Sequence, residues 1–349
     1  MRSYKDHLLL DSSTIKEALL KLDILAKDAI LFIVNKNQEL IGSLTDGDVR
    51  RGLLKGITID NVVTDIIQSN PKFIRKGEYD IEKIIKYREE NYKVLPVIDK
   101  KGVVSNVVNF RVLRSYLPVD AVIMAGGRGS RLQPLTNDTP KPLLKVGDKA
   151  IMEHNVDRLA LYGIDDYWFS VKYLGEQIES FFGNGENKNL SINYVWEDEP
   201  LGTVGAVSKI DDFKHDYVLL TNSDILTNLD YEQFYLDFIE KDADFSLVSI
   251  PYHVNIPYAV LEKGNDGCVT NFKEKPTYTY YSNGGIYLMK RSVLDYIPKN
   301  QFFNATDLME KLIEENKKII SYPLAGYWLD VGKHEDFKKA QEDIKKIKF

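Results

Sequence analysis

Strands alternate with helices between residues 121 and 222, and this alternation constrains the fold more than any other feature of the sequence. The segments with strand patterns are 121–125, 166–171, 191–196 and 217–222, and those with helical patterns are 150–162, 174–182 and 204–210. Such alternation predicts an α/β fold whose sheet is mostly parallel and covered by helices on both faces. Ligands of such sheets bind beyond the carboxyl ends of the strands. We therefore expect the functional site in the loop that follows the first strand.

That loop reads "AGGRGSRLQPLTNDTPKPLL" from Ala125. A Walker A loop would need G-x-x-x-x-G-K-[ST], which is absent. A dinucleotide-binding loop would need a third glycine opening a long helix, but Leu132 and three prolines make that helix improbable. A purely structural turn would explain the glycines but not the cations Arg128, Arg131 and Lys141. We interpret the segment as a proline-stiffened loop that wraps a polyphosphate with backbone N–H groups and cations.

Composition limits the classes of protein that remain. A chain of 349 residues predicts two domains, and a net charge of −6 argues against a general nucleic-acid binder. The apolar runs are too short to span a membrane, and the start lacks the apolar stretch of a secretory signal. One cysteine, Cys268, permits no disulfide within the chain, and its alternating surroundings predict a buried, inert thiol. We expect a cytoplasmic protein with no membrane or nucleic-acid partner.

The N-terminal third contains an internal repeat. A shift of 64 positions aligns residues 30–53 with 94–117 without a gap. Each copy predicts two strands joined by a polar turn and followed by a helix, with a further helix before them at 14–26 and 80–90. Two units of this size should pack together as one domain. Residues 117–120, "LPVD", would form the joint to the second domain.

The first copy carries the string "GSLTDGD" with Gly42, Thr45 and Asp48, which resembles the nucleoside-binding pattern of cystathionine-β-synthase (CBS) domains. The resemblance implies an α+β CBS-domain pair across residues 1–117. It also implies that Thr45 and Asp48 bind the ribose of a regulatory purine nucleotide. A simpler explanation is that Asp46 and Asp48 cap the helix that begins near Val49. The corresponding positions of the second copy are Asn106, Asn109 and Val112, so the pattern is lost there.

The glycine-rich loop is similar to the signature of the sugar-1-phosphate nucleotidyltransferases. Further motifs of that family follow in order: "EDEPLGTVGA", "LLTNSDILT", "FKEKP", "SNGGIYLM" and "WLDVGKHEDF". The resemblance implies a Rossmann-like (GT-A type) domain across residues 118–349, with a mixed, mostly parallel sheet. It also implies an enzyme that joins a sugar 1-phosphate to a nucleoside triphosphate and releases pyrophosphate, with Mg²⁺ as cofactor. The alternative in kind is a nucleotide-sensing regulator that has lost catalysis.

The resemblance assigns roles to residues of each motif. Arg131 would grip the β- and γ-phosphates, Lys141 the α-phosphate and Lys275 the phosphate of the sugar. Asp224 and Asp330 would hold Mg²⁺, which prefers carboxylate and phosphate oxygens. The other expected nucleotide-binding residues are Ala125, Gly126, Gly127, Gly129 and Ser130, and the expected sugar-binding residues are Gly202, Glu274, Asn283 and Gly285.

Simpler explanations exist for several of these acidic and basic residues. Asp224 could form an Asn-x-Asp turn, and Asp330 could cap the helix near His334. Glu274 and Lys275 could be a solvated ion pair, which would contribute little to stability. The motifs that surround these residues favour the functional interpretation.

The segment "WEDEPLGTVG" is most similar to the guanylyltransferases that act on mannose or heptose 1-phosphate. A carboxylate can accept both N–H groups on the Watson–Crick edge of guanine, so we expect Glu197 or Glu199 to read GTP. A CBS pair ahead of this domain resembles the guanylyltransferases of bacterial legionaminic acid pathways, which implies glucosamine 1-phosphate as substrate. Mannose or heptose 1-phosphate, and UTP, CTP or dTTP, are the alternatives. We also expect a homo-oligomer.

Overall fold

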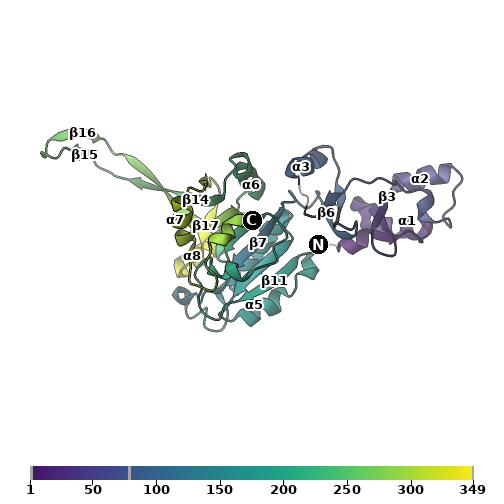
Figure 1. The fold of residues 1–349 in the computed structure, drawn as a ribbon, viewed down its shortest axis with the longest axis horizontal. Helices are drawn as coiled ribbons and strands as arrows, with labels where there is room; N and C mark the ends of the chain where they lie inside the picture. Colours follow the sequence, from purple (N-terminus) through teal and green to yellow (C-terminus); the bar gives the residue numbers. More distant parts are fainter. Residues whose placement is uncertain (1–2, 78–79, 348–349) are drawn as a thin grey trace.

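A computed structural model describes residues 3–77 and 80–347 (Figure 1). The repeat pair, residues 3–117, lies at one end of an elongated molecule. A seven-stranded sheet with its helices, the sheet domain, forms the middle, and a thin two-stranded arm projects from the opposite end. No helix in the described ranges is long and apolar enough to cross a membrane.

The two repeats have the same strand topology, which confirms the internal repeat. In each three-stranded sheet the middle strand runs parallel to the first strand and antiparallel to the third. The first repeat consists of β1 (Leu8–Leu10), α1 (Ile15–Leu25), β2 (Ile30–Val34), β3 (Leu40–Thr45) and α2 (Asp46–Leu54). The second consists of β4 (Ile74–Arg75), α3 (Ile81–Glu89), β5 (Val94–Ile98) and β6 (Val104–Asn109).

The helix predicted at the end of the second copy is wrong, because residues 110–117 form turns and extended chain. In the first copy a reciprocal capping box between Thr45 and Asp48 starts α2. In the second copy Val112 replaces that aspartate and cannot cap. Asn109 Oδ1 instead accepts the N–H of Arg111 at 3.0 Å, which closes a turn. Without a capping residue at this position, no helix begins after β6.

Three hydrophobic clusters show how the repeats pack. The first repeat has its own cluster around Leu22, Leu31 and Leu44. A second cluster joins Phe32 of the first repeat to Val94 and other residues of the second. The remaining core of the second repeat belongs to the main cluster of the sheet domain. The second repeat is therefore packed against both neighbours.

The sheet domain is built on a mixed sheet in the order β11-β10-β7-β12-β17-β14-β18. Only β17 runs antiparallel to its neighbours β12 and β14, so the predicted mixed, mostly parallel sheet is confirmed. The strands are β7 (Val119–Met124), β10 (Asp166–Val171), β11 (Ser191–Trp196), β12 (Tyr217–Asn222), β14 (Phe245–Asn255), β17 (Thr277–Lys290) and β18 (Ile319–Pro323).

Both faces of the sheet are covered. Ala121 and Ile123 of β7 pack in the cluster that contains α4, α5 and α6, whereas Val122 packs in the cluster that contains α7. The helices are α4 (Ile151–Leu161), α5 (Gly175–Phe182), α6 (Tyr231–Glu240), α7 (Ala305–Glu314) and α8 (His334–Asp343). Alternate residues of a strand point to opposite faces, so β7 is buried on both sides.

The short elements complete the chain and correct two expected boundaries. The predicted 204–210 helix is a 3-10 helix, and β7 begins at Val119, so strand replaces half of the expected joint. The 3-10 helices are η1 (Tyr4–His7), η2 (Ala26–Asp28), η3 (Val63–Asp65), η4 (Ser130–Leu132), η5 (Lys141–Leu143), η6 (Glu186–Lys188), η7 (Gly205–Lys209) and η8 (Arg291–Tyr296). The short strands are β8 (Lys145–Val146), β9 (Lys149–Ala150), β13 (Ile225–Thr227) and β19 (Trp328–Asp330).

The arm consists of the outer halves of β14 and β17 and of the hairpin β15 (Val260–Lys263) and β16 (Val269–Lys273) at its tip (Figure 1). None of the residues 251–282 is buried. The prediction that Cys268 is a buried core thiol is wrong, because it lies exposed in the turn of the hairpin. Alternation along a strand predicts one covered face, but this ribbon leaves the body and has no covering layer.

Candidate active site

The glycine-rich loop leaves the carboxyl end of β7 and contains only the short turns η4 and η5, as its prolines predict. Gly129 has a φ of +62°, and a Cβ there would lie 2.9 Å from Cβ of Lys141. A Cβ on Gly126 would lie 2.8 Å from Oε1 of Glu197. Only glycine fits both positions, which lets the loop fold onto residues that lie far along the chain.

A pocket of 330 Å³ opens beside this loop. It brings together predicted residues from the glycine loop, the segment after β11 and the end of β12. Its lining residues are Met124, Gly126, Gly127, Gly129, Ser130, Arg131, Lys141, Pro142, Glu197, Gly202, Thr203, Asn222, Ser223 and Asp224. Three of these lining residues, Asn222, Ser223 and Thr203, were not predicted, although they lie inside the motifs "LLTNSDILT" and "EDEPLGTVGA".

The two predicted metal-binding aspartates lie side by side. The pairing of β13 with β19 places Ile225 opposite Asp330, and the N–H of Val331 donates to the carbonyl of Asp224 at 3.0 Å. The buried Lys141 side chain forms an ion pair with Asp224, and its Nζ lies 4.0 Å from Oδ1 of Asp330. Residues more than a hundred positions apart therefore converge on one point.

These carboxylates have the properties of a cation site. Oδ1 of Asp224 and Oδ1 of Asp330 are both buried and accept no hydrogen bond. Burial, together with the neighbouring Asp224, raises the pKa of Asp330, and this outweighs the opposing effects of Lys141 and Arg131. Two close carboxylates with unused oxygens fit a hard divalent ion such as Mg²⁺, which takes one or two carboxylates and then phosphate oxygens.

Glu197 and Glu199 differ in their surroundings. Glu197 is buried in the pocket wall, where Oε1 accepts a hydrogen bond from Ser170 Oγ and Oε2 accepts one from the N–H of Leu201 at 3.0 Å. Each carboxylate oxygen can accept a further hydrogen bond. The Glu199 side chain is 89% exposed and lies 4.0 Å from Lys172 Nζ. Only Glu197 is held rigidly toward the pocket.

The glycine and asparagine of the "SNGG" motif lie near the pocket. A Cβ on Gly285 would be 2.7 Å from Nδ2 of Asn222, which lines the pocket. The Asn283 side chain is turned to the protein: Nδ2 donates to Tyr287 Oη at 2.9 Å, and Oδ1 accepts the N–H of Gly285 at 2.9 Å. Gly202 contributes to the pocket wall directly.

Glu274 and Lys275 are not brought to the pocket. They are exposed and lie on the arm, between β16 and β17. The ribbon from Thr277 to Asn283 is paired with β14 along its length, and an extended segment of that size spans about 20 Å. In this structure the two residues are therefore separated from the carboxylate pair by the length of the ribbon.

A model of the nucleotidyl transferase family matches residues 120–347. The chain belongs to the nucleotidyl transferase family. The match begins at the second residue of β7 and includes every motif that carried the resemblance. Arg131, Lys141 and the carboxylate pair therefore lie inside the family domain.

Several members of the nucleotidyl transferase family are similar in sequence to the chain. Mannose-1-phosphate guanylyltransferase of Mycobacterium tuberculosis is 32% identical over 232 residues, covering 65% of this chain and 64% of that protein. UTP–glucose-1-phosphate uridylyltransferase of Synechocystis is 29% identical, covering 63% of this chain and 62% of that protein. The D-glycero-α-D-manno-heptose 1-phosphate guanylyltransferase of Aneurinibacillus thermoaerophilus is 31% identical, covering 65% of this chain and 98% of that protein. The chain thus spans less than two thirds of the first two relatives.

Solved structures share the nucleotidyl transferase fold. A Bacillus anthracis protein crystallised with sucrose has a TM-score of 0.53 at 24% identity, covering 66% of this chain and 97% of that chain. HddC of Yersinia pseudotuberculosis has a TM-score of 0.50 at 25% identity, and the match covers 65% of this chain and 99% of HddC. HddC was also solved in a complex with GMP-PN.

A second cluster of ionisable side chains lies at the opposite, amino-terminal edge of the nucleotidyl transferase sheet. Asp120, Asp166 and His215 are buried close to one another. Lys76 of the second repeat reaches this cluster, with Nζ 2.8 Å from Asp166 Oδ2, and Asp120 accepts the N–H groups of Lys214 and His215. Unlike Asp224 and Asp330, neither Asp120 nor Asp166 has a buried oxygen without a hydrogen bond, and Lys76 neutralises the site. The cluster is therefore better explained as a buried network than as a metal site.

Outside the nucleotidyl transferase domain, Gly42, Thr45 and Asp48 make contacts that favour helix capping. Asp48 is buried and accepts hydrogen bonds from Thr45, Arg51 and Gln68. A Cβ on Gly42 would lie 2.8 Å from Ile67 Cδ1. The helix begins at Asp46 rather than near Val49. Ribose binding at these residues stays a prediction.

Proposed function

We propose that the chain is a sugar-1-phosphate nucleotidyltransferase that uses GTP. The observation that carries the proposal is the convergence of Arg131, Lys141, Asp224 and Asp330 beside the glycine loop. The similarity to relatives named for mannose and heptose 1-phosphate supports a sugar 1-phosphate and GTP as substrates. We also propose glucosamine 1-phosphate as the sugar substrate, with mannose and heptose 1-phosphate as the competing candidates.

The reaction needs positioning and charge neutralisation rather than a general base. An oxygen of the sugar phosphate attacks the α-phosphorus of the triphosphate, the new P–O bond forms, and pyrophosphate leaves with the electrons of the broken bond. Arg131 and Lys141 would bind the triphosphate and stabilise the charge that grows on the leaving group. Mg²⁺ held by Asp224 and Asp330 would supply further positive charge to the phosphates when bound.

The buried Lys141 has a specific place in this proposal. It lies near the end of the glycine loop, where it pairs with Asp224 and packs close to Gly129. Two opposite unit charges about 4 Å apart gain roughly 4 kcal/mol at an effective dielectric of 20. The lysine therefore holds the carboxylates together before substrate binds, and it presents a cation to the phosphates.

Base selection is assigned to Glu197. Glu197 lines the pocket, its carboxylate is fixed by Ser170 and Leu201, and each of its oxygens can accept a further hydrogen bond. Guanine offers two adjacent N–H donors, whereas uracil and thymine offer one. Glu197→Gln should lower kcat/KM for GTP by about 10²-fold, in line with losing a charged hydrogen-bond acceptor, and Glu199→Gln should change it less than about threefold. Equal effects of the two substitutions would contradict the assignment.

The decisive experiment is pyrophosphate release from purified protein with each of GTP, UTP, CTP and dTTP, Mg²⁺, and glucosamine, mannose or heptose 1-phosphate. GTP with one of these sugars should give turnover that chelation by EDTA abolishes. Asp330→Asn should lower kcat by at least about 10²-fold and weaken Mg²⁺ binding measured by calorimetry. Asp148→Asn, an exposed acid outside the pair and the pocket, is the matched control. Tight nucleotide binding without pyrophosphate release from any pair would support the catalytically inactive regulator instead.

A further inference from the structure

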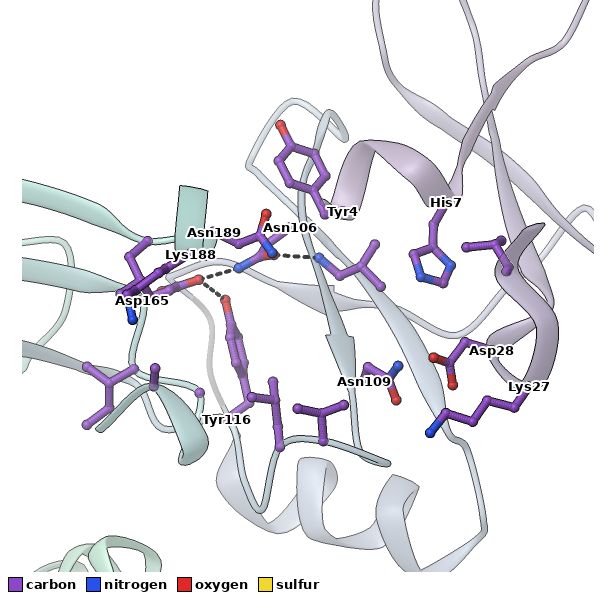
Figure 2. A pocket seen from close by; sticks show the side chains of 18 of the residues that line it. Tyr4, His7, Lys27, Asp28, Asn106, Asn109, Tyr116, Asp165, Lys188 and Asn189 are labelled. Atoms are coloured by element: carbon purple, nitrogen blue, oxygen red, sulfur yellow. Dashed lines mark hydrogen bonds between the residues drawn. The ribbon is translucent and has the colours of Figure 1, made fainter. Parts of the chain in front are cut away.

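A cavity of 630 Å³ lies where the repeat pair meets the sheet domain (Figure 2). Its acidic side chains are paired within the protein: Asp165 accepts hydrogen bonds from Asn106 and Tyr116, and Asp28 forms an ion pair with Arg111. A surface without a partner in the described part of the chain lies instead on the arm, far from the repeat pair (Figure 1).

The arm has one aromatic face and one mostly polar face. In the ribbon of β14 and β17, Tyr252 pairs with Tyr280 and Val254 with Tyr278, so these four side chains share a face. The opposite face is mostly polar, with His253, Asn255, Thr277 and Thr279. Strands that alternate in this way are normally covered on their apolar face. No other segment in the described ranges covers this face, since Tyr252 and Tyr280 are 65% and 61% exposed.

The root of the arm is fixed to the body. Ser249 is only 2% exposed, and its carbonyl accepts the N–H of Leu324 at 2.9 Å. Trp328 Nε1 donates to the carbonyl of Gly284 at 2.8 Å. Beyond these contacts β14 and β17 pair without interruption as far as Thr277. Folding the arm back onto the pocket of its own chain would break such bonds, which is costly for backbone groups. The pocket of a second copy can be reached without breaking them.

The pocket beside the glycine loop is short of positive charge for two phosphorylated substrates. Arg131 and Lys141 are the only cations among the described residues that line it, and Lys141 is already paired with Asp224. Lys275 is exposed on the arm and forms no ion pair with another described residue. A cation brought by an arm would therefore complement the charge of the pocket and its phosphates.

Apolar surface near the pocket matches that of the arm. Leu135 of the glycine loop is 41% exposed, and the 62% exposed Phe302 precedes Phe303, whose carbonyl packs against Gly202 of the pocket wall. Four aromatic side chains of the arm are more than 60% exposed: Tyr252, Tyr258, Phe272 and Tyr280. They present about 500 Å² on each arm. Two docked arms would bury about 1,000 Å² of this surface, which reaches the size of a specific protein interface.

We propose that the arm of one copy of the chain docks on the pocket of a second copy and completes it with Lys275. Two copies related by a two-fold axis exchange their arms. Each site then takes its glycine loop and carboxylate pair from one copy and its sugar-phosphate cation from the other. The role of the cation rests on the proposed function, whereas the docking of the arm does not. Bound sugar phosphate strengthens the docking, because its charge pairs with Lys275.

A heterodimer of two impaired variants tests the exchange. Chains with Lys275→Ala and with Asp330→Asn carry different affinity tags and are co-expressed, and the heterodimer is purified through both tags. One of its two sites carries both substitutions and the other carries neither, so pyrophosphate release should reach about half that of the wild type. The matched control combines Lys141→Ala with Asp330→Asn, both in the body, and should stay inactive.

The opposite result is equally clear. If each arm serves its own pocket, both sites of the first heterodimer carry one substitution, and it is as inactive as its parents. That result beside an active wild type overturns the exchange and leaves the proposed function standing.

The docking is tested without turnover in GDP, Mg²⁺ and glucosamine 1-phosphate, which cannot react because GDP has no pyrophosphate to release. Analytical ultracentrifugation should show the wild type as a dimer. Tyr280→Thr, on the aromatic face, should weaken the dimer by at least about tenfold. Tyr281→Thr, on the opposite face and equally exposed at 62%, should weaken it less than about twofold. A monomeric wild type, or equal effects of the two substitutions, overturns the proposal.

Discussion

Asp120 is a carboxylate that the sheet domain buries completely at the start of β7. Burial raises the pKa of Asp120 to about 6, although His215 and the N–H groups of Lys214 and His215 oppose the shift. The neighbouring Asp166 behaves differently, because its hydrogen bond with His215 and the charge of Lys76 outweigh burial and lower its pKa to about 2. Asp120 and Asp166, which are neighbours in space, therefore titrate in separate pH ranges.

These shifts predict how stability depends on pH. The folded state binds a proton at Asp120 that the unfolded chain has already lost, so the free energy of unfolding should fall as pH rises from about 4 to about 6. The decrease is at most about 3 kcal/mol for a shift of about two units. Asp120→Asn should flatten this part of the profile, measured by urea unfolding at several pH values. The stability that Asp166 contributes is lost only below pH 4, so it does not interfere. An unchanged slope in the variant would refute the prediction.

At the scale of elements, the arm is notable because none of its residues 251–282 is buried against the rest of the protein. Its strands pair only with each other, and large side chains such as Tyr258, Phe272 and Tyr280 are more than 60% exposed. A two-stranded ribbon of this kind is marginally stable alone. The predicted sugar-binding residues Glu274 and Lys275 lie on it, so their role requires the arm to approach the pocket when substrate binds.

This requirement is testable with one matched pair of lysines. Lys275→Ala should lower kcat/KM for the sugar phosphate by about 10²-fold, because a phosphate-binding cation is lost. Lys273→Ala, on the same arm and paired with Glu262 at 3.3 Å, should change it less than about twofold. Amide hydrogen exchange of β15 and β16 should be fast in the free protein and slower with both substrates bound. Identical kinetics of the two variants would remove Lys275 from the site.

For the whole molecule, the second repeat connects the first repeat to the sheet domain. Its core is continuous with that of the sheet domain, and polar contacts add to it. Arg88 of α3 forms a two-pronged ion pair with the mostly buried Glu232 of α6, with both distances at 2.9 Å. The hydrogen bond with Glu232 raises the pKa of Arg88. The second repeat and the sheet domain should therefore unfold together.

Arg88→Met tests this connection. It leaves Glu232 partly buried without its partner and should lower the free energy of unfolding by about 1–3 kcal/mol. Lys86→Met on the same helix breaks only an exposed pair with Glu90 at 4.0 Å and should change it by less than about 0.5 kcal/mol. Thermal or urea unfolding measures both. If Arg88→Met instead separates the unfolding into two transitions, the ion pair rather than the shared core couples the parts.

The sequence by itself determined the elements and the chemistry that depend on local pattern. Alternating strands and helices, the helix-free glycine loop and the repeat all follow from periodicity, glycine and proline, which act over a few residues. The order of the motifs likewise identified the family. One wrong prediction was local, because the helix expected after β6 lost its capping residue. The other was not, because alternation around Cys268 does not show whether a second layer covers the strand, and the residue is exposed.

Only the tertiary structure decided which of the predicted residues meet. The β13–β19 pairing joins Asp224 to Asp330, and burial leaves one oxygen of each without a hydrogen bond. The tertiary structure also distinguished Glu197 from Glu199, placed Lys275 on a projecting arm and formed a cavity at the second repeat. These features depend on contacts between segments far apart in the chain, and on burial, which no single segment encodes.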